Sequence, residues 1–466
     1  MLLLFFFAYI ISLLVISHYA AKRLKKDSED YLTTGRSMPP WVVAFSAIGT
    51  NYSGFLFLGQ AGFIFNNGLQ TVVITIGWKL GDFVTMYFAH RRLRLLAAET
   101  GSSDYLSLIF KLHSGTRNVF AYATTVLALV FLCFYAAAQI TASTKIFQNQ
   151  FSIDWTVATL LTVTIIGLYS LKGGMRSSMW TDCLQTFIML VSLSILAAVI
   201  IYKVPSIDGL FKNIKDLGPS HLSLFPKHLQ NSHLGLLILF VVGWIFGGIG
   251  TLGQPHVMSR FLTLEDPSQI KRVRRIYIPL SIFLFVLILF ISLSARTIID
   301  GAIDGELVLP ILSEKLSPGF LNAVLLVGIL SAVFSTVDSQ ILSATAISDH
   351  FLGYKKNIDW QRRKAFFIFL AASGAICVFR IYDIFNLVIF AWASLASCFV
   401  PLVFYGLAEK HFSMKQSFIV VLTGISSALL WRFSGYNIYF YDTAVGIVAG
   451  LIVGGLSIFL TKKKTA

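Results

Sequence analysis

The residues best suited to binding an ion lie in one apolar run near residue 335. From Gly328 to Gln340 the chain reads GILSAVFSTVDSQ, with polar side chains at Ser331, Ser335, Thr336, Asp338, Ser339 and Gln340. A lipid-facing helix surface does not accept so many polar groups, because hydrocarbon offers them no hydrogen-bond partners. Hydroxyls and backbone carbonyls are hard oxygen ligands, and a monovalent cation such as sodium takes about five or six of them. The run therefore predicts a sodium site.

The spacing inside this run makes the prediction more specific. On a helix the Ala332 carbonyl and the Ser335 and Thr336 hydroxyls stand at i, i+3 and i+4, so they point to one side. Further oxygens must come from a helix that does not use all its carbonyls internally. The Gly-interrupted run GTNYSGFLFLGQAG, Gly49 to Gly62, supplies the carbonyls of Gly49 and Tyr52. A lone Ser or Thr more often bonds to its own helix backbone, but a cluster beside an aspartate favours an ion.

The elements that must position these residues are membrane-spanning helices. The 466-residue chain is 56% hydrophobic and only 13% charged, whereas soluble domains average about 25% charged residues. Apolar runs bounded by charged or turn residues predict an all-α integral membrane protein with about 13 transmembrane helices. The predicted spans are 1–20, 40–65, 68–90, 118–147, 153–171, 177–203, 231–258, 276–296, 318–347, 365–383, 385–408, 416–433 and 439–461.

The net charge of +15 has its origin in the loops. Most Lys and Arg residues fall in alternate connections, as the positive-inside rule requires, which explains the charge without a nucleic-acid partner. Residues 1–20 are followed, not preceded, by a basic cluster, so they predict a retained helix with its N-terminus outside. This topology predicts a multi-pass protein of the cell (inner) membrane with a cytoplasmic C-terminus. It puts Arg36 at the cytoplasmic mouth as a gate residue, unless the side chain simply snorkels at a helix end.

Two of the predicted helices are interrupted in the same way. The second contains Leu58–Gln60 and the seventh, GWIFGGIGTLGQPH from Gly243 to His256, contains Leu252–Gln254. They lie five helices apart and enter the membrane from opposite sides, as in transporters built from inverted repeats. We therefore expect two inverted five-helix repeats, helices 2–6 (residues 40–203) and 7–11 (231–408), with three extra helices in 1–20 and 416–461. The alternative is that these glycines only permit close helix packing.

Three carboxylates fall well inside predicted spans, where a charge is costly. Lys79 precedes Asp82 by three residues, so we expect a local ion pair between them. Asp182 and Asp338 have no such partner nearby in sequence.

The chain resembles the sodium:solute symporter family, and most closely its sodium/proline symporter branch. The resemblance rests on Tyr31-Leu-Thr-Thr-Gly-Arg-Ser, Ser46-Ala to Ser53-Gly, Gly173-Gly, Trp180-Thr-Asp, Gly253-Gln-Pro-His with Arg260, and Ser335-Thr-Val-Asp-Ser-Gln-Ile-Leu leading to Asp349. It implies the inverted-repeat fold and solute uptake driven by a sodium gradient.

The resemblance also implies ion sites. It places the shared sodium on the carbonyls of Gly49, Tyr52 and Ala332 and the hydroxyls of Ser335 and Thr336, the five groups that the spacing selects. In some members a second sodium lies near the aspartate matching Asp182, and Ser335, Asp338 and Ser339 match its other ligands. The two aspartates could instead repel each other and hold a proton.

For the substrate pocket the resemblance implies Tyr135, and Pro255 in the second helix break. The proline branch has an acidic residue, a methionine and two tryptophans where this chain has Asn51, Tyr52, Phe55 and Gly247. A glycine at position 247 should enlarge the pocket and remove an aromatic wall. Ser53 and Gln139 are further candidates for the lining.

Together these features predict a sodium-coupled symporter that imports a small organic solute, a proline-like amino acid or a small carboxylate, by alternating access. Two alternatives stay open: a proton-coupled transporter using Asp182 or Asp338, and a membrane sensor that keeps the fold without transport. An enzyme is not expected, because the nine histidines lack HExxH spacing and no Gly-x-Ser-x-Gly elbow is present. The sequence does not specify an oligomeric state.

Overall fold

The computed structural model describes residues 1–23, 28–115, 117–170, 174–203, 206–299, 301, 303–352, 358–380 and 383–465. Within these ranges the secondary structure is helical, apart from one isolated bridge between Met38 and Leu264. Gly173, which the sequence analysis placed in a motif, lies outside the described residues.

The thirteen predicted runs all coincide with helices. The corresponding helices are α1 (Leu2–Lys22), α3 (Pro40–Gly54) continued by η2 (Phe55–Gln60) and α4 (Ala61–Asn67), α5 (Gln70–Phe88), α8 (Val119–Phe151), α9 (Trp155–Ser170), α10 (Gly174–Lys203), α13 (Leu234–Ile249) continued by η4 (Gly250–Gly253) and α14 (Pro255–Leu262), α15 (Ile270–Ile298), α17 (Phe320–Leu352), α18 (Ile358–Val378), α19 (Ile384–Leu407), α20 (Met414–Phe433) and α21 (Asp442–Thr465). Among the described residues, ten helices are long and apolar enough to cross a membrane, or eleven if α5 and the bent α6 form one span. The exact count of thirteen therefore stays a prediction.

Short helices occupy several connections that the sequence analysis treated as loops. They are α2 (Ser28–Thr33), η1 (Thr34–Arg36), α6 (His90–Glu99), α7 (Tyr105–Lys111), α11 (Ile207–Asp216), α12 (Pro219–Leu222), η3 (Lys227–Leu229), η5 (Pro267–Gln269), η6 (Gly305–Leu307), α16 (Val308–Leu316) and η7 (Tyr436–Ile438). Their sequences are too short or too polar to give a membrane-span signal, so the search for long apolar runs passed over them.

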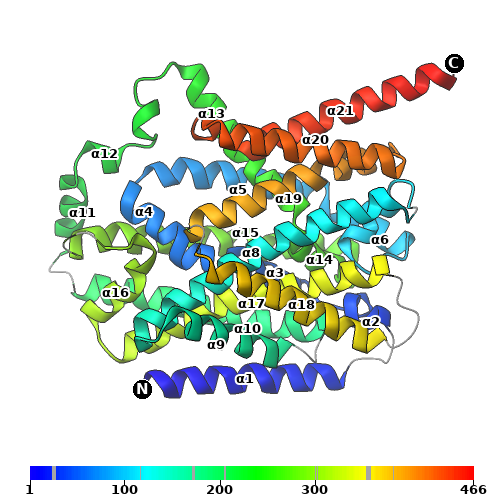
Figure 1. The fold of residues 1–466 in the computed structure, drawn as a ribbon. Helices are drawn as coiled ribbons and strands as arrows, with labels where there is room; N and C mark the ends of the chain where they lie inside the picture. The colour runs from blue at the N-terminus through cyan, green and yellow to red at the C-terminus, as the bar shows by residue number, and fades with distance from the viewer. Residues whose placement is uncertain are drawn as a thin grey trace.

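The long helices run side by side, with α1 along one edge of the bundle and α20 and α21 along the opposite edge (Figure 1). The most apolar windows of α17 and α19 are each 89% buried, whereas that of α1 is 22% buried. The centre of the bundle is therefore formed by α17, α19 and their neighbours, and α1, α20 and α21 are peripheral.

The helix contacts have an internal regularity. The helix α3 packs on α10 and on α15, and the matching broken helix packs on α19 through η4 and on α5 through α13. Likewise α10 contacts α17 as α19 contacts α8, and α8 contacts α9 as α17 contacts α18. Each of these pairs thus has a counterpart when α3–α10 are exchanged for α13–α19 in chain order, the pattern that two five-helix repeats would give. The division into residues 40–203 and 231–408 stays a prediction.

Glycines bring α5 and α13 into backbone contact. A Cβ added at Gly248 would lie 1.8 Å from the Trp78 carbonyl oxygen, and one at Gly81 would lie 2.0 Å from the Ile245 carbonyl oxygen. Small residues permit such close helix packing in membranes. Close packing and helix interruption, which the sequence analysis set against each other, therefore both occur in the Gly-rich seventh span.

Both interrupted helices are broken where the glycines predicted. In the first, Ser53 has φ +28°, and the following residues, Phe55–Gln60, form a π-helical stretch. The freed Gly54 N–H donates to Gln139 Oε1 at 2.8 Å. In the second, Gln254 is extended between η4 and α14, and its side-chain amide donates to the Gly250 and Trp392 carbonyls at 3.2 and 3.1 Å. A side chain from a neighbouring helix at the first break, and the side chain of Gln254 itself at the second, thus provide hydrogen bonds that the helix backbone lacks there.

Candidate ion sites and solute cavity

The hydroxyl cluster of α17 faces the break in α3. The Ser335 hydroxyl donates to the Gly49 carbonyl at 2.8 Å and lies 3.0 Å from the Ala332 carbonyl. Thr336 Oγ1 lies 3.1 Å from the Thr50 and Ala332 carbonyls and 3.4 Å from that of Gly49. These side chains are fully buried. Two helices about 280 residues apart in sequence thus present neutral oxygens to one point, which is the donor set suited to sodium.

Tyr52 is placed differently from the other predicted ligands. Its carbonyl accepts the Phe55 N–H at the end of α3, and within the described residues no hydrogen bond joins it to Ser335 or Thr336. The carbonyl of Thr50 meets Thr336 instead. The helix register that brings Gly49 to Ser335 places Thr50 one residue further along the same turn, which spacing alone did not reveal.

Gly49 has a packing reason as well as a carbonyl. A Cβ at this position would lie 2.7 Å from Thr186 Oγ1 and 3.3 Å from the Asp182 carbonyl oxygen, both on α10. The absent side chain therefore lets α3 sit between α10 and α17.

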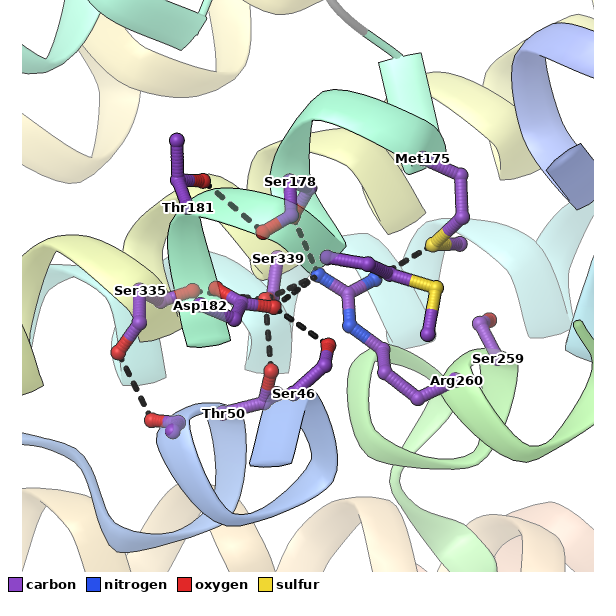
Figure 2. Close-up of polar contacts among 12 residues, drawn as sticks. Ser46, Thr50, Met175, Ser178, Thr181, Asp182, Ser259, Arg260, Ser335 and Ser339 are labelled. Carbon is purple, nitrogen blue, oxygen red and sulfur yellow. Dashed lines mark hydrogen bonds and ion pairs between the residues drawn. The ribbon is translucent and has the colours of Figure 1, made fainter. Parts of the chain in front are cut away.

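The predicted second cation site contains an arginine side chain. Arg260, on α14, is fully buried, and its guanidinium donates to Ser178 Oγ at 2.6 Å and forms a short hydrogen bond with Ser339 Oγ. It also lies 3.4 Å from Asp182 Oδ2, which accepts a 2.6 Å hydrogen bond from Ser46. Figure 2 shows Arg260 reaching across from α14 to these groups on α10 and α17. A fixed positive charge thus lies where the resemblance implied a mobile one.

Asp338 and Ser339 take different positions around this arginine. Ser339 Oγ donates to the Ser335 carbonyl at 2.7 Å and is 2.9 Å from Thr50 Oγ1, so it connects the arginine to the hydroxyl cluster. Asp338 is buried and interacts electrostatically with Arg260, but no ion pair or direct hydrogen bond between them is present. The sequence analysis quoted Arg260 as part of a motif without giving it this role, because the contact joins residues about 80 positions apart.

A cavity lies on the other side of the α3 break. Its empty space, with the solvent-open part included, is about 740 Å³. Its walls come from the first of the two broken helices (α3, η2 and α4) and from α5, α8, α13, α15 and α19. Half of the lining residues are aromatic. The aromatic lining residues are Tyr52, Phe55, Phe63, Trp78, Tyr135, Trp244, Phe285, Phe385 and Trp392.

The structure brings only part of the predicted pocket to this cavity. Asn51, Phe55 and Tyr135 line it. The others do not: Ser53 and Gln139 hold the freed N–H groups of the break, and Pro255 begins α14. The two helix breaks themselves use these residues.

Gly247 does not open the cavity wall. A Cβ there would lie 3.0 Å from the Tyr441 ring and 3.2 Å from Trp78, and its carbonyl accepts a 2.9 Å hydrogen bond from the Trp392 indole. Tryptophans from α5 and α19 therefore supply the aromatic wall that a side chain at position 247 would have supplied. These tryptophans lie in apolar runs, where the sequence carries no signal that separates a pocket residue from a core residue.

Lys79 and Asp82 do not form the expected ion pair, since no salt bridge within 4.0 Å joins them. Asp82 Oδ2 accepts a 2.9 Å hydrogen bond from the Tyr277 hydroxyl, which in turn accepts one of 2.7 Å from Asn51. Lys79 lies over the Tyr52 ring, with Nζ 4.0 Å from the ring centroid, and lines the cavity. Helical spacing predicted that both side chains share one face of α5. In the structure each side chain instead contacts another helix, Asp82 through Tyr277 of α15 and Lys79 through Tyr52 of α3.

Arg36 lies at the end of the bundle near α6. Its guanidinium donates to the Ala97 and Ser102 carbonyls at 2.8 and 2.9 Å. The adjoining backbone pairs with the end of α14: Met38 N–H donates to the Thr263 carbonyl, and Glu265 N–H donates to that of Met38. Arg36 is thus fixed to backbone groups beside a contact between the two predicted repeats.

Glu306 organises the opposite end of the bundle, at the start of α19. Its carboxylate accepts the Ile384 N–H at 2.6 Å, at the start of α19, and binds Lys145 Nζ of α8 at 2.5 Å. Burial raises the pKa of Glu306, and the Lys145 charge partly offsets this effect. Phe385 follows directly and lines the cavity, and its N–H also donates to the Glu306 carboxylate at 3.3 Å, so Glu306 positions part of the cavity wall.

Comparisons with known proteins agree with this architecture. The model of the sodium:solute symporter family matches residues 31–424. The osmoregulated proline transporter OpuE of Bacillus subtilis is 26% identical over 98% of this chain and 94% of its own. The sodium/proline symporter of Staphylococcus aureus is 26% identical over 98% and 92%.

Among solved structures, a Na+-coupled sialic acid symporter superposes with a TM-score of 0.78 at 16% identity, covering 97% of each chain. Mhp1, a nucleobase-cation-symport-1 family transporter, superposes with a TM-score of 0.57 at 12% identity, covering 93% of this chain and 94% of its own. The likeness to these two structures concerns the fold.

Proposed function

The chain belongs to the sodium:solute symporter family, a family of transporters rather than enzymes, and we propose that it imports a small organic solute together with one sodium ion. The observation that carries the proposal is that one break in one helix serves both sites. Gly49 and Thr50 meet the α17 hydroxyls, and Asn51 and Phe55 line the cavity. An ion that orders the break also orders the cavity wall.

Coupling follows from this shared element. Sodium bound by the α3 carbonyls and the Ser335 and Thr336 hydroxyls would fix the conformation of residues 49–55. A solute that requires the same conformation then binds more tightly, and by linkage it raises the sodium affinity by the same factor. The membrane potential adds about 2.3 kcal/mol per 100 mV for each positive charge carried inward.

The proposed count of one sodium rests on Arg260. Its guanidinium already neutralises Asp182 and contacts Ser339, so a second cation there would meet a like charge. The same contact gives the carboxylate a permanent partner and weighs against Asp182 as a proton carrier. We therefore assign Asp182 and Ser339 to holding Arg260, with Asp338 adding a longer-range attraction, rather than to transporting a cation.

For the orientation we propose a multi-pass protein of the cell membrane with the N-terminus outside. The loops rich in Lys and Arg favour this orientation, because such loops generally face the cytoplasm. It places Glu306 and the cavity mouth outside and Arg36 inside, so that Arg36 and the Met38–Leu264 bridge close the inner path. The units 40–203 and 231–408 would then rearrange relative to each other.

Uptake into proteoliposomes tests the proposal. Labelled L-proline and labelled small carboxylates are supplied under an inward sodium gradient, with potassium replacing sodium in one control and a sodium-free pH gradient in the other. We expect uptake only with sodium. Uptake driven by the pH gradient alone would support proton coupling, and a silent panel together with saturable ligand binding would favour a sensor.

A further inference from the structure

The cavity lining contains one charged side chain, Lys79, which has no hydrogen bond or ion pair among the described residues. Lys79 lies in the middle of α5, between the exposed residues Ile76 and Leu80, which face away from the bundle. Its ammonium faces inward over the Tyr52 ring. Asp82, which accepts a hydrogen bond from Tyr277, attracts this ammonium from beyond ion-pair distance and leaves its N–H groups without an acceptor in the described part of the chain. Charges inside membrane proteins are expensive and are generally kept for function.

The rest of the lining shows what this ammonium could meet. The described lining contains no carboxylate. Gln60, whose amide donates to Thr75 Oγ1 at 3.0 Å, and Asn51 add neutral polar groups. Most of the remaining surface is aromatic, with Trp78 and Trp392 ring centroids 5.0 Å apart and those of Phe55 and Phe385 5.3 Å apart. The site therefore offers one cation and a set of flat apolar walls.

We propose that the solute is a monocarboxylate with a compact apolar or aromatic body and no amino group beside the carboxylate. Its carboxylate binds Lys79 through a charge-assisted hydrogen bond, and its body lies against the tryptophan and phenylalanine rings. This inference rests on the proposed transport function and specifies its substrate. An α-amino acid would bring a second ammonium into a cavity that already holds one and has no carboxylate to receive it.

The ligand preference is tested with two matched pairs that differ in the amino group. Cyclopentanecarboxylate has the ring of proline without its nitrogen in the ring, and 3-phenylpropionate is phenylalanine without its amino group. Binding to the purified full chain in sodium is followed by tryptophan fluorescence, since Trp78, Trp244 and Trp392 line the cavity. We expect each acid to bind at least about tenfold more tightly than its amino acid, the effect of one charged contact.

Variants of Lys79 test the role of the residue itself. Lys79→Met should weaken binding of both acids about tenfold or more, Lys79→Arg should retain most of it, and Lys22→Met, at the end of α1, should change nothing. Equal binding of an acid and its amino acid, binding of neither acid, or undiminished acid binding by Lys79→Met overturns the proposal. If Lys79→Met does not fold, the wild-type ligand ranking and Lys79→Arg decide the question.

The same measurements separate this inference from the proposed symport. Sodium-driven uptake of L-proline without uptake of cyclopentanecarboxylate would overturn the carboxylate assignment and leave the symport intact. Tight acid binding that needs Lys79 but not sodium would leave the carboxylate site intact and overturn sodium coupling.

Discussion

Two neighbouring polar clusters in this protein use opposite chemistry. The first, at Gly49, Ser335 and Thr336, consists of neutral hydroxyl and carbonyl oxygens. The second, at Asp182 and Ser339, contains a carboxylate and is already engaged by Arg260. A neutral set of oxygens can take up and release a monovalent ion, whereas a buried carboxylate needs a permanent partner. The charged cluster therefore has a structural role here, and the uncharged cluster is the proposed transport site.

The largest expected effect comes from removing the arginine. Arg260→Gln leaves Asp182 buried without its cation, which should destabilise the fold by roughly 3–5 kcal/mol. Thermal unfolding of the purified protein measures this loss. The double variant Arg260→Gln/Asp182→Asn, which removes both charges, should recover much of the stability. A single variant as stable as wild type would contradict the structural role.

The arginine variant also sharpens the proposed ion count. Without the guanidinium, Asp182 and Ser339 are free to receive a second sodium. The Hill coefficient for sodium-dependent activity should then rise from about one towards two in Arg260→Gln, if enough protein folds for assay. A Hill coefficient near two for the wild-type protein would show instead that a second sodium binds beside Arg260.

The next effect concerns the neutral cluster. Ser335→Ala and Thr336→Ala each remove one proposed ligand, and each should raise the sodium concentration for half-maximal uptake by roughly tenfold, with little loss of stability. Thr336→Ser keeps the hydroxyl and serves as the matched control. Unchanged sodium dependence in both alanine variants would remove this cluster as the sodium site.

Ser339 lies between the two clusters and should give a smaller, mixed result. Ser339→Ala removes contacts with Arg260 and Thr50, so we expect about 1 kcal/mol of destabilisation and a severalfold weaker apparent sodium affinity. Thermal unfolding and sodium titration on one preparation check both effects. If only stability falls, the clusters are energetically independent.

Replacing Arg36 is expected to have the smallest effect. Its guanidinium contacts two carbonyls at a half-buried position, so Arg36→Ala should cost about 1 kcal/mol and change the uptake rate severalfold. Sodium affinity should stay near wild type, measured by titration of binding. A large loss of sodium affinity would mean that the inner end is coupled to the ion site.

Much of this protein was predictable because the bilayer restricts what the backbone can do. Every predicted apolar run is a helix, since a spanning segment must satisfy its own hydrogen bonds. The interrupted helices were visible from their glycines, and the hydroxyl cluster from its i, i+3 and i+4 spacing. The four groups Gly49, Ala332, Ser335 and Thr336 meet in the structure as that spacing suggested.

The cavity was much less predictable, because its walls come from several helices. Tyr135 was identified by its match to a pocket tyrosine of the proline branch. Trp78 and Trp392 also line the cavity, but they lie in apolar runs that resemble any other core segment. Local spacing paired Lys79 with Asp82, and only contacts with Tyr277 and Tyr52 show their actual environments.

By itself, then, the sequence determined the membrane-spanning helices, the positions of the two breaks and the hydroxyl side of α17, because these depend on local composition and helical period. Only the tertiary structure decided that Thr50 meets Thr336, that Arg260 neutralises Asp182 and that Lys79 faces the cavity. The reason is physical: a side chain's partner is set by the register of packed helices, and that register depends on residues distant in the chain.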